Sequence, residues 1–309
     1  MTQQPLLKLG TRRSPLALAQ AEETRARLCA AHGWDANAVE LVLVEASGDK
    51  VQDRPLAEIG GKALWTKELD VWLADGHIDA AVHSLKDVET IRPAAFTLAA
   101  ILPRADKRDR LIGAKSLADL PTGAVIGTSA PRRAAQALHV RPDCSVVTFR
   151  GNVATRLAKL EAGEADATFL AAAGLSRLGQ DDVGTVLDPE EWLPAPAQGA
   201  IAVECRTDDE RVRALLDPLD HAPSHAEVMA ERALLLALGG SCHSPVAVRC
   251  TFADGRLSMR AAIFSPAGQE RVEGEAEFAA GDMHAPAELA ADLLKRAGSG
   301  IAAVFAGPQ

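Results

Sequence analysis

The segment TKELDVWLADGHIDAAVHSL, residues 66–85, carries the clearest indication of the fold class. Its first half has the apolar spacing of a helix and closes at Gly76, a common helix stop. The run IDAAVHSL, residues 78–85, is then almost continuously apolar and predicts a buried strand. A helix that leads into a buried strand indicates an α/β fold with a largely parallel sheet.

The same alternation extends in both directions from this segment. On the N-terminal side LLKLGT predicts a strand, and the next run predicts a helix with Ser14 as N-cap and Pro15 in its first turn. On the C-terminal side AVIGTS predicts a strand that leads into a helix opened by Pro131. Two hinge-like stretches, residues 103–110 and 193–200, flank the second α/β part. We therefore expect two lobes with a cleft between them.

The character of the chain changes near Asp220. Ser224 and Glu227 predict a capping box for the next helix, which Gly239 and Gly240 would end. Three strand-like runs and a last helix then predict a small antiparallel sheet of α+β type. We expect three domains, with these boundaries: 1–102 with 198–219, 103–197, and 220–309.

Composition excludes several classes of protein. The 309 residues include 33 Lys and Arg against 42 Asp and Glu, and a net charge of −9 argues against general nucleic-acid binding. No apolar run is long enough to span a bilayer, and the start MTQQPLLKLG lacks the features of a signal peptide. The five cysteines are scattered without metal-ligand spacing, so we expect neither a disulfide framework nor a metal site. A cytoplasmic protein is the expectation.

Arginines recur at the turns where a predicted strand leads into a helix. A helix N-terminus offers unpaired N–H groups, and the arginine fork suits carboxylate or phosphate groups. In an acidic chain this clustering indicates a cleft for a polyanionic small molecule, although ordinary surface ion pairs are the alternative. The arginines are Arg12 and Arg13 before Ser14, Arg132 and Arg133 after Ser129, and Arg150 and Arg156 around Asn152.

The motif HSLKD, residues 83–87, follows the buried strand of the opening segment. Ligands of open α/β sheets bind at strand ends, where Lys86 offers a cation and Asp87 a carboxylate. A solvated loop is the alternative. Lys62, in the glycine-flanked stretch GGKALW, predicts either a mobile lid or a plain flexible loop.

One thiol, Cys242, lies in the Gly-Gly-Ser loop after the third-domain helix. A helix C-terminus raises the pKa of a thiol, which argues against a turnover nucleophile. A thiol used once, as a permanent covalent tether, needs no such activation. On the residues alone, a buried structural cysteine is the favoured interpretation.

Taken together, the ordered motifs from residue 8 to about residue 250 resemble the porphobilinogen deaminase family, also called hydroxymethylbilane synthases. The motifs are TRRSPLALAQA, PLAEIGGKALWTKELD, DAAVHSLKDV, IGTSAPRR, FRGNVATRLAKLEAGEADATFLAAAGLSRLG, LPAPAQGAIAVECR and GGSCHSPV.

The resemblance implies two α/β domains of the type II periplasmic-binding-protein kind around a cleft, plus a small α+β C-terminal domain. It also implies a dipyrromethane cofactor attached to Cys242 by a thioether. On that primer four porphobilinogen molecules are condensed with loss of ammonia, and hydrolysis releases linear hydroxymethylbilane for tetrapyrrole and haem biosynthesis. Porphobilinogen and the growing oligopyrrole are the implied partners of a monomer that binds neither nucleic acid nor membrane.

The resemblance also implies roles for individual residues. Asp87 takes the catalytic position and stabilises positive charge on pyrrole nitrogens. The remaining residues bind the cofactor and the substrate, both of which carry carboxylate groups. For the cofactor these are Cys242, Lys86, Ser129, Arg132, Arg133 and Arg156, and for substrate they are Arg12, Ser14, Lys62, Arg150, Arg156, Arg177 and Gln198.

Some positions depart from the commoner family pattern. They lie beside Ser129, beside the cofactor cysteine Cys242, and in or near the predicted lid around Lys62. The departures are Ala130 and Pro131 for serine and leucine, Ser241 for glycine, His243 for glutamine, Trp65 for phenylalanine and Glu58 for lysine.

Two other functions fit parts of the sequence. A two-lobed anion receptor without catalysis would share the fold, but it leaves Asp87 and Cys242 without a role. A zinc-dependent nucleobase deaminase would need H-x-E and P-C-x-x-C motifs, which the sequence lacks.

Overall fold

The computed structural model describes residues 5–45, 66–241 and 243–305. The chain divides into two compact units. The first unit comprises Met1–Val51, Gly61–Ala105 and Gly199–His225, and the second comprises Gln52–Gly60, Asp106–Gln198 and Ala226–Gln309. Across the described part of the chain, no helix combines the length and the apolar character that a membrane span requires.

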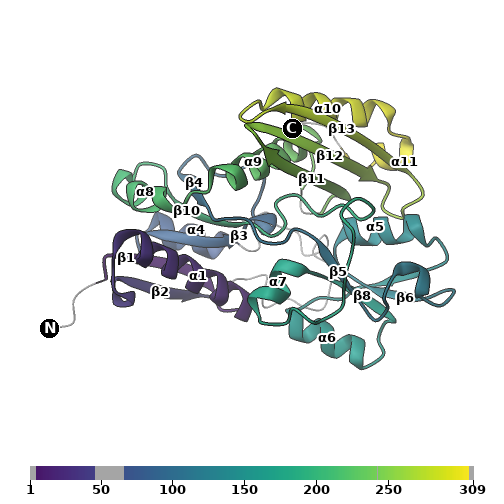
Figure 1. The fold of residues 1–309 in the computed structure, drawn as a ribbon, viewed down its shortest axis with the longest axis horizontal. Helices are drawn as coiled ribbons and strands as arrows, with labels where there is room; N and C mark the ends of the chain where they lie inside the picture. The colour runs from purple at the N-terminus through teal and green to yellow at the C-terminus, as the bar shows by residue number, and fades with distance from the viewer. Residues whose placement is uncertain (1–4, 46–65, 242, 306–309) are drawn as a thin grey trace. The chain divides into compact units, whose positions relative to one another are not determined.

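The first unit is built on a five-stranded mixed sheet with the order β2-β1-β3-β10-β4 (Figure 1). β1 runs parallel to β2 and β3, whereas β10 lies antiparallel between β3 and β4. β3 and β10 are buried along nearly their whole length, in keeping with their apolar sequences. The strands are β1 (Leu7–Arg12), β2 (Val39–Val44), β3 (Ala80–Ser84), β4 (Phe96–Ile101) and β10 (Ile201–Arg206).

Helix α1 of the first unit begins at the predicted signals, and α4 ends at Ala74, two residues before the predicted stop at Gly76. The hydroxyl of Ser14 accepts a hydrogen bond from the N–H of Ala17 at 3.3 Å, and Pro15 opens α1. Gly33 ends this helix with a φ of 66°, in the left-handed region that favours glycine. The elements are α1 (Pro15–His32), α4 (Lys67–Ala74), α8 (Glu210–Leu216) and the short 3-10 turns η1 (Ala36–Ala38), η2 (Leu85–Asp87) and η4 (Asp217–Leu219).

The second unit contains another five-stranded mixed sheet, with the order β7-β6-β8-β5-β9. β6 is parallel to β7 and β8, and β5 is antiparallel to β8 and β9. The strands are β5 (Asp109–Ile112), β6 (Val125–Gly127), β7 (Ser145–Val147), β8 (Ala167–Ala171) and β9 (Thr185–Val186), with α5 (Pro131–Val140), α6 (Val153–Glu161), α7 (Ala172–Arg177) and η3 (Leu117–Asp119).

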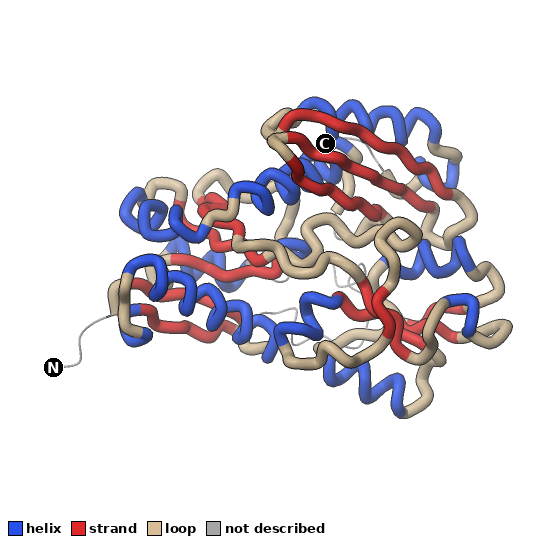
Figure 2. The backbone as a smooth tube through the Cα atoms, viewed as in Figure 1, coloured by secondary structure: helices blue, strands red, loops and turns tan. Residues whose placement is uncertain are grey.

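A three-stranded antiparallel sheet with the order β11-β12-β13 also belongs to the second unit. Figure 2 shows α10 lying along this sheet, and Leu289 and Leu293 of that helix share a core with Leu257 and Ile263 of β12. The elements are β11 (Val246–Ala253), β12 (Arg256–Phe264), β13 (Arg271–Ala279), α9 (Ala222–Ala237), α10 (His284–Arg296) and α11 (Ser299–Ala302).

The fold class expected from the sequence is confirmed, but the expectation of largely parallel sheets is wrong. In each five-stranded sheet two of the four strand pairings are antiparallel, because a strand from a distant part of the chain is inserted beside the parallel ones. Two α/β sheets and a small α+β part follow one another along the chain, with β10 returning to the first sheet. The exact limits of the three expected domains stay a prediction.

The predicted capping box of α9 is wrong. The helix begins at Ala222, so Ser224 lies inside its first turn rather than before it. His221 takes the capping position instead, because its Nδ1 lies 3.4 Å from the backbone N of Ser224 and 2.8 Å from its hydroxyl. Glu227 accepts a hydrogen bond from the N–H of Phe252 in β11.

Candidate active site

Lys86 and Asp87 lie on η2, directly after the carboxyl end of β3. Leu85 anchors this turn, because its side chain is fully buried and its N–H donates to the carbonyl of Ala200 at 3.1 Å. Lys86 and Asp87 are themselves half-buried. The turn therefore places a cation and a carboxylate side by side at the end of a buried strand.

Arg12 and Ser14 belong to the same edge of the first sheet. Arg12 is the last residue of β1, and Ser14 follows it as the N-cap of α1. Because β1 and β3 are adjacent and parallel, their carboxyl ends lie at one sheet edge. The structure thus brings Arg12, Ser14, Lys86 and Asp87 to one edge of the first sheet.

In the second unit, Arg132 and Arg133 are both buried against one carboxylate. Each arginine side chain is 5% exposed, and that of Asp109, which faces both, is 0% exposed. The Arg132 Nη2 lies 2.8 Å from Asp109 Oδ2, and the Arg133 Nη2 lies 2.7 Å from Oδ1. Burial alone would raise the pKa of Asp109, but the two guanidinium groups outweigh it and hold that pKa below its usual range.

Gln198 and Trp192 complete this cluster. The Trp192 Nε1 donates to Asp109 Oδ2 at 2.9 Å, and the Gln198 Nε2 donates to Oδ1 at 2.9 Å. The Gln198 Oε1 accepts a hydrogen bond from Arg132 Nη2 at 3.2 Å. Of the predicted site residues, Arg132, Arg133 and Gln198 therefore form one network within the second unit.

The other predicted residues of this unit lie at strand ends and helix starts. Ser129 follows β6 and Arg150 follows β7, two adjacent parallel strands, and Arg150 is only 5% exposed. The Arg156 Nε donates to the carbonyl of Gly151 at 3.0 Å in the first turns of α6. Arg177 ends α7 and is half-buried.

Cys242 and Lys62 lie outside the described residues, as do the departures Trp65 and Glu58. The residues on either side of Cys242 form a hydrogen-bonded turn. The Ser244 hydroxyl accepts from the N–H of Ser241 at 3.0 Å, and the Ser241 hydroxyl accepts from the N–H of His243 at 3.2 Å. Burial lowers the pKa of His243, which favours its neutral form.

Sequence reasoning missed the buried carboxylates, among them Asp109 and Glu204. Glu204 is 0% exposed within β10, where it binds Arg92. A signal for Glu204 was present, since an acidic residue interrupts the apolar strand AIAVECR. For Asp109 there was none, because several charged residues precede β5 and nothing in their order marks the buried one.

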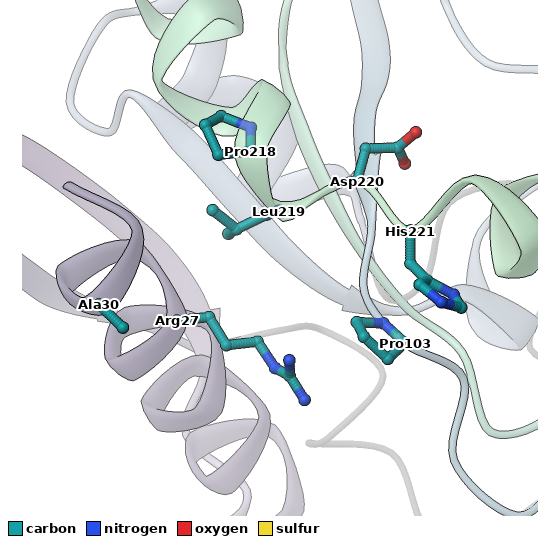
Figure 3. Close-up of a pocket in the computed structure, with 7 residues that line it drawn as sticks. All are labelled: Arg27, Ala30, Pro103, Pro218, Leu219, Asp220 and His221. Carbon is teal, nitrogen blue, oxygen red and sulfur yellow. The ribbon is translucent and has the colours of Figure 1, made fainter.

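A pocket of about 280 Å³ lies elsewhere in the first unit (Figure 3). It contains none of the predicted site residues, and its polar side chains are already satisfied. Arg27 binds Glu23, and Asp220 accepts from the N–H of Ile101 and pairs with His225. Its lining consists of Arg27, Ala30, Pro103, Pro218, Leu219, Asp220 and His221.

Comparisons with known proteins agree with the family motifs of the sequence. Residues 7–214 match the family model described as "Porphobilinogen deaminase, dipyromethane cofactor binding domain", and residues 225–298 match "Porphobilinogen deaminase, C-terminal domain". A porphobilinogen deaminase of Sphingopyxis alaskensis is 56% identical, covering 97% of this chain and 96% of the relative. One from Nitrobacter hamburgensis is 47% identical, covering 98% and 97%.

Solved structures that resemble the chain include a periplasmic substrate-binding protein of an ABC transporter from Coxiella burnetii. It is 17% identical, with a TM-score of 0.41, over 74% of this chain and 95% of that one. A solute-binding protein from Desulfovibrio salexigens has a TM-score of 0.40 at 12% identity, over 71% of this chain and 73% of that one. Both TM-scores lie below 0.5.

Proposed function

Because the chain belongs to the porphobilinogen deaminase family, we propose a division of labour among its residues in the family reaction. That reaction joins four porphobilinogen molecules head to tail onto a dipyrromethane primer, with loss of ammonia, and releases linear hydroxymethylbilane. In the proposal, Asp87 is the catalytic group and Cys242 holds the primer. The observation that carries it is the common sheet edge of Arg12, Ser14, Lys86 and Asp87.

The second unit supports the binding of a carboxylate-bearing pyrrole group. One carboxylate, Asp109, faces two guanidinium groups, so the cluster keeps a net positive charge of one. Among the described residues, the buried Nε of Arg132 has no hydrogen-bond partner. A buried donor in a cationic cluster is costly unless an acceptor reaches it. These residues therefore fit a ligand that brings carboxylate arms.

Asp87 is the proposed catalytic residue. Loss of ammonia from porphobilinogen places positive charge on the pyrrole of the substrate. An ionised carboxylate held at the sheet edge stabilises that charge as it develops, because it is already oriented before the reaction. Asp87 also accepts or returns protons at its carboxylate oxygens.

Arginines and a lysine hold the carboxylate arms of the pyrrole rings. In the first unit these are Arg12 and Lys86, with the hydroxyl of Ser14 beside them. In the second unit they are Arg132, Arg133, Arg150, Arg156 and Arg177, with Ser129 and Gln198 as neutral partners. Lys62 completes the proposed set. Planar guanidinium groups bind carboxylates through two parallel hydrogen bonds, which fixes the rings as well as attracting them.

Cys242 is the proposed attachment point of the dipyrromethane. When bound, this group supplies the free pyrrole carbon to which the first substrate is joined. The Cys242 sulfur would form this link as its soft, nucleophilic thiolate, and the resulting C–S bond of the thioether is durable. The proposal also includes a monomeric protein that acts in the cytoplasm without nucleic-acid partners.

The role of Asp87 is tested by Asp87→Ala, with Asp75→Ala as a matched control. Asp75 is an exposed residue after α4 in the same unit. Asp87→Ala is expected to keep its dipyrromethane, seen by intact mass, and to lose at least about a hundredfold in kcat. Asp75→Ala is expected to stay near wild-type activity. Full steady-state activity of Asp87→Ala would remove that residue from the mechanism.

A further inference from the structure

Two side chains that flank the turn of Asp87 meet at one buried carboxylate, that of Glu204. Arg92 follows the turn, and its Nε and Nη2 lie 2.8 and 2.7 Å from the two oxygens of Glu204. His83 precedes the turn, and its Nε2 lies 3.3 Å from Glu204 Oε2, without the alignment of a hydrogen bond. Glu204 belongs to β10, the strand inserted beside β3. The segment that carries Asp87 is thus held at both ends by one residue of the neighbouring strand.

Arg92 also connects this carboxylate to the turn and to α4. Its Nη2 lies 2.6 Å from Asp70 Oδ1 on α4, and its Nη1 lies 2.8 Å from Glu89 Oε2, two residues beyond Asp87. The hydroxyl of Thr66 donates to Glu89 and accepts from Arg92. All three nitrogens of the guanidinium group are therefore engaged. Only a planar fork can bind these groups together, so lysine would not replace it.

A role in stability alone does not account for this buried network of charges. Three carboxylates surround one guanidinium group, and the side chains of Arg92 and Glu204 are 8% and 0% exposed. Burial of charge is costly, and such clusters often add little net stability relative to apolar packing. What a fully satisfied buried network does provide is one fixed geometry. Here the geometry that it fixes is the path of residues 83–92.

We propose that Glu204 and Arg92 are positioning residues that hold the turn of Lys86 and Asp87 in its catalytic place. They touch neither substrate nor cofactor, and they act through the backbone of the segment between His83 and Arg92. The inference rests on the proposed role of Asp87. Among the described residues of the first sheet, Glu204 is the one charged residue without exposed surface, and the inference gives it a function.

The test compares Arg92→Lys with Arg206→Lys. Arg206 is a matched control because it lies on the same strand as Glu204 and also bridges several groups, namely the carbonyls of Leu73 and Ile78 and the carboxylate of Asp209. None of its partners belongs to the Asp87 turn. Both variants are assayed well below their unfolding temperatures, and kcat is expressed per dipyrromethane-loaded chain.

Arg92→Lys is expected to lower kcat by about ten- to a hundredfold, the scale of a small misplacement of a catalytic group. Arg206→Lys is expected to change it less than twofold. The backbone N–H of Val88, which donates to the carbonyl of Leu85, is expected to exchange faster with solvent only in Arg92→Lys. Wild-type kcat in a folded, loaded Arg92→Lys would overturn the inference.

A double-mutant cycle separates positioning from general damage. Asp87→Glu displaces the carboxylate by one methylene, and it is combined with Arg92→Lys and, separately, with Arg206→Lys. If Arg92 acts through Asp87, the double variant loses less than the product of the single losses, whereas the Arg206 pair is multiplicative. Multiplicative losses for the Arg92 pair would contradict the inference.

Glu89→Gln provides a second variant should Arg92→Lys fail to fold. It weakens the link between Arg92 and the turn but leaves Glu204 paired, and a severalfold drop in kcat is expected. No drop would overturn the inference. If Asp87→Ala kept full activity, the proposed function would fail and the inference with it. An impaired Asp87→Ala beside a normal Glu89→Gln would refute the inference alone.

Discussion

Asp109 binds Arg133 with both of its carboxylate oxygens, at 2.7 Å from Nη2 to Oδ1 and 3.3 Å from Nε to Oδ2. The same carboxylate also receives Arg132, so one buried anion holds both members of the Arg-Arg pair. An arginine pair buried without it would face strong mutual repulsion. Asp109 therefore explains how two adjacent guanidinium groups are kept inside the second unit.

Asp109→Asn is expected to destabilise the protein by about 3–5 kcal/mol, because it leaves two buried cations without a counter-charge. Urea denaturation measures the change. Asp106→Asn is the control, since Asp106 pairs with Arg108 where both side chains are partly exposed, and a loss below about 1 kcal/mol is expected. Equal losses of unfolding free energy in the two variants would show that burial of Asp109 adds nothing to its contribution to stability.

Arg132 and Arg133 are expected to differ when each is replaced by lysine. Every nitrogen of Arg133 already has a partner within the unit, including the carbonyl of Phe169 at 2.9 Å from Nη1. Arg133→Lys should therefore lower the free energy of unfolding, and it should weaken carboxylate binding less than Arg132→Lys does. Arg132 keeps a buried Nε without a partner among the described residues, so Arg132→Lys should weaken carboxylate binding about tenfold or more.

Two measurements separate these effects: the denaturation midpoint, and the fraction of chains that carry dipyrromethane by intact mass. Arg132→Lys is expected to reduce the loaded fraction more than Arg133→Lys does. The reverse order would mean that Arg133, not Arg132, is turned toward the ligand.

Glu231 of α9 joins the segment before Gln198 to β11. Its Oε2 accepts from the N–H of Ala197 at 2.7 Å, and its Oε1 accepts from the N–H of Cys250 at 3.1 Å. Ala197 has a φ of 57°, which a non-glycine residue adopts only when it is held there. Glu231→Gln puts an amide N–H against one of these donors, so a loss of about 2–3 kcal/mol is expected.

Glu288→Gln is the matched control, because Glu288 is exposed on α10. Its effect on the free energy of unfolding is expected within about 0.5 kcal/mol of zero. A Glu231→Gln protein as stable as the control would contradict the role given to that carboxylate.

Acidic pH should lower the stability of the first unit, because it protonates Glu204. Burial alone would raise the pKa of this carboxyl, but His83 and Arg92 outweigh burial and lower the pKa to about 2. Because the folded pKa is below the ordinary value of 4.5, the stabilisation is complete above pH 4.5 and is lost as the pH falls toward 2. At neutral pH it is on the order of 3 kcal/mol.

The comparison of wild type with Glu204→Gln isolates this contribution, since burial raises the pKa of the neighbouring Asp70 and so acts in the opposite direction. Urea denaturation between pH 7 and pH 3 is expected to show a stability difference that shrinks as the pH falls. A difference that stays constant across that range would exclude Glu204 as the titrating group.

Local patterns predicted much of the fold because the relevant signals lie within a few residues of one another. Ser14 caps α1, and the side chain of Asn152 caps α6 by accepting from the N–H of Thr155 at 2.9 Å. The position of Lys86 and Asp87 at a strand end followed from the apolar run before them. The capping box failed because His221, a residue outside the motif, competes for the N–H of Ser224.

Sequence reasoning could not predict the pairings between distant segments. Arg92 and Glu204 are 112 residues apart, and Arg132 and Asp109 are joined only once β5 lies beside β8. The insertion of β10 between β3 and β4 brings the first pair together, and no local periodicity encodes that choice of neighbours. A resemblance to a family supplies residue roles, but it does not name the buried partners that hold those residues in place.

The thiol of Cys242 is the proposed point at which dipyrromethane is attached. Intact-mass analysis of the purified wild type, Cys242→Ala and the control Cys29→Ala tests this directly. The expected result is a mass above that of the sequence, by one dipyrromethane, in the wild type and the control, and the bare sequence mass in Cys242→Ala. An active wild-type chain at the bare mass, or an adduct that survives in Cys242→Ala, would contradict it.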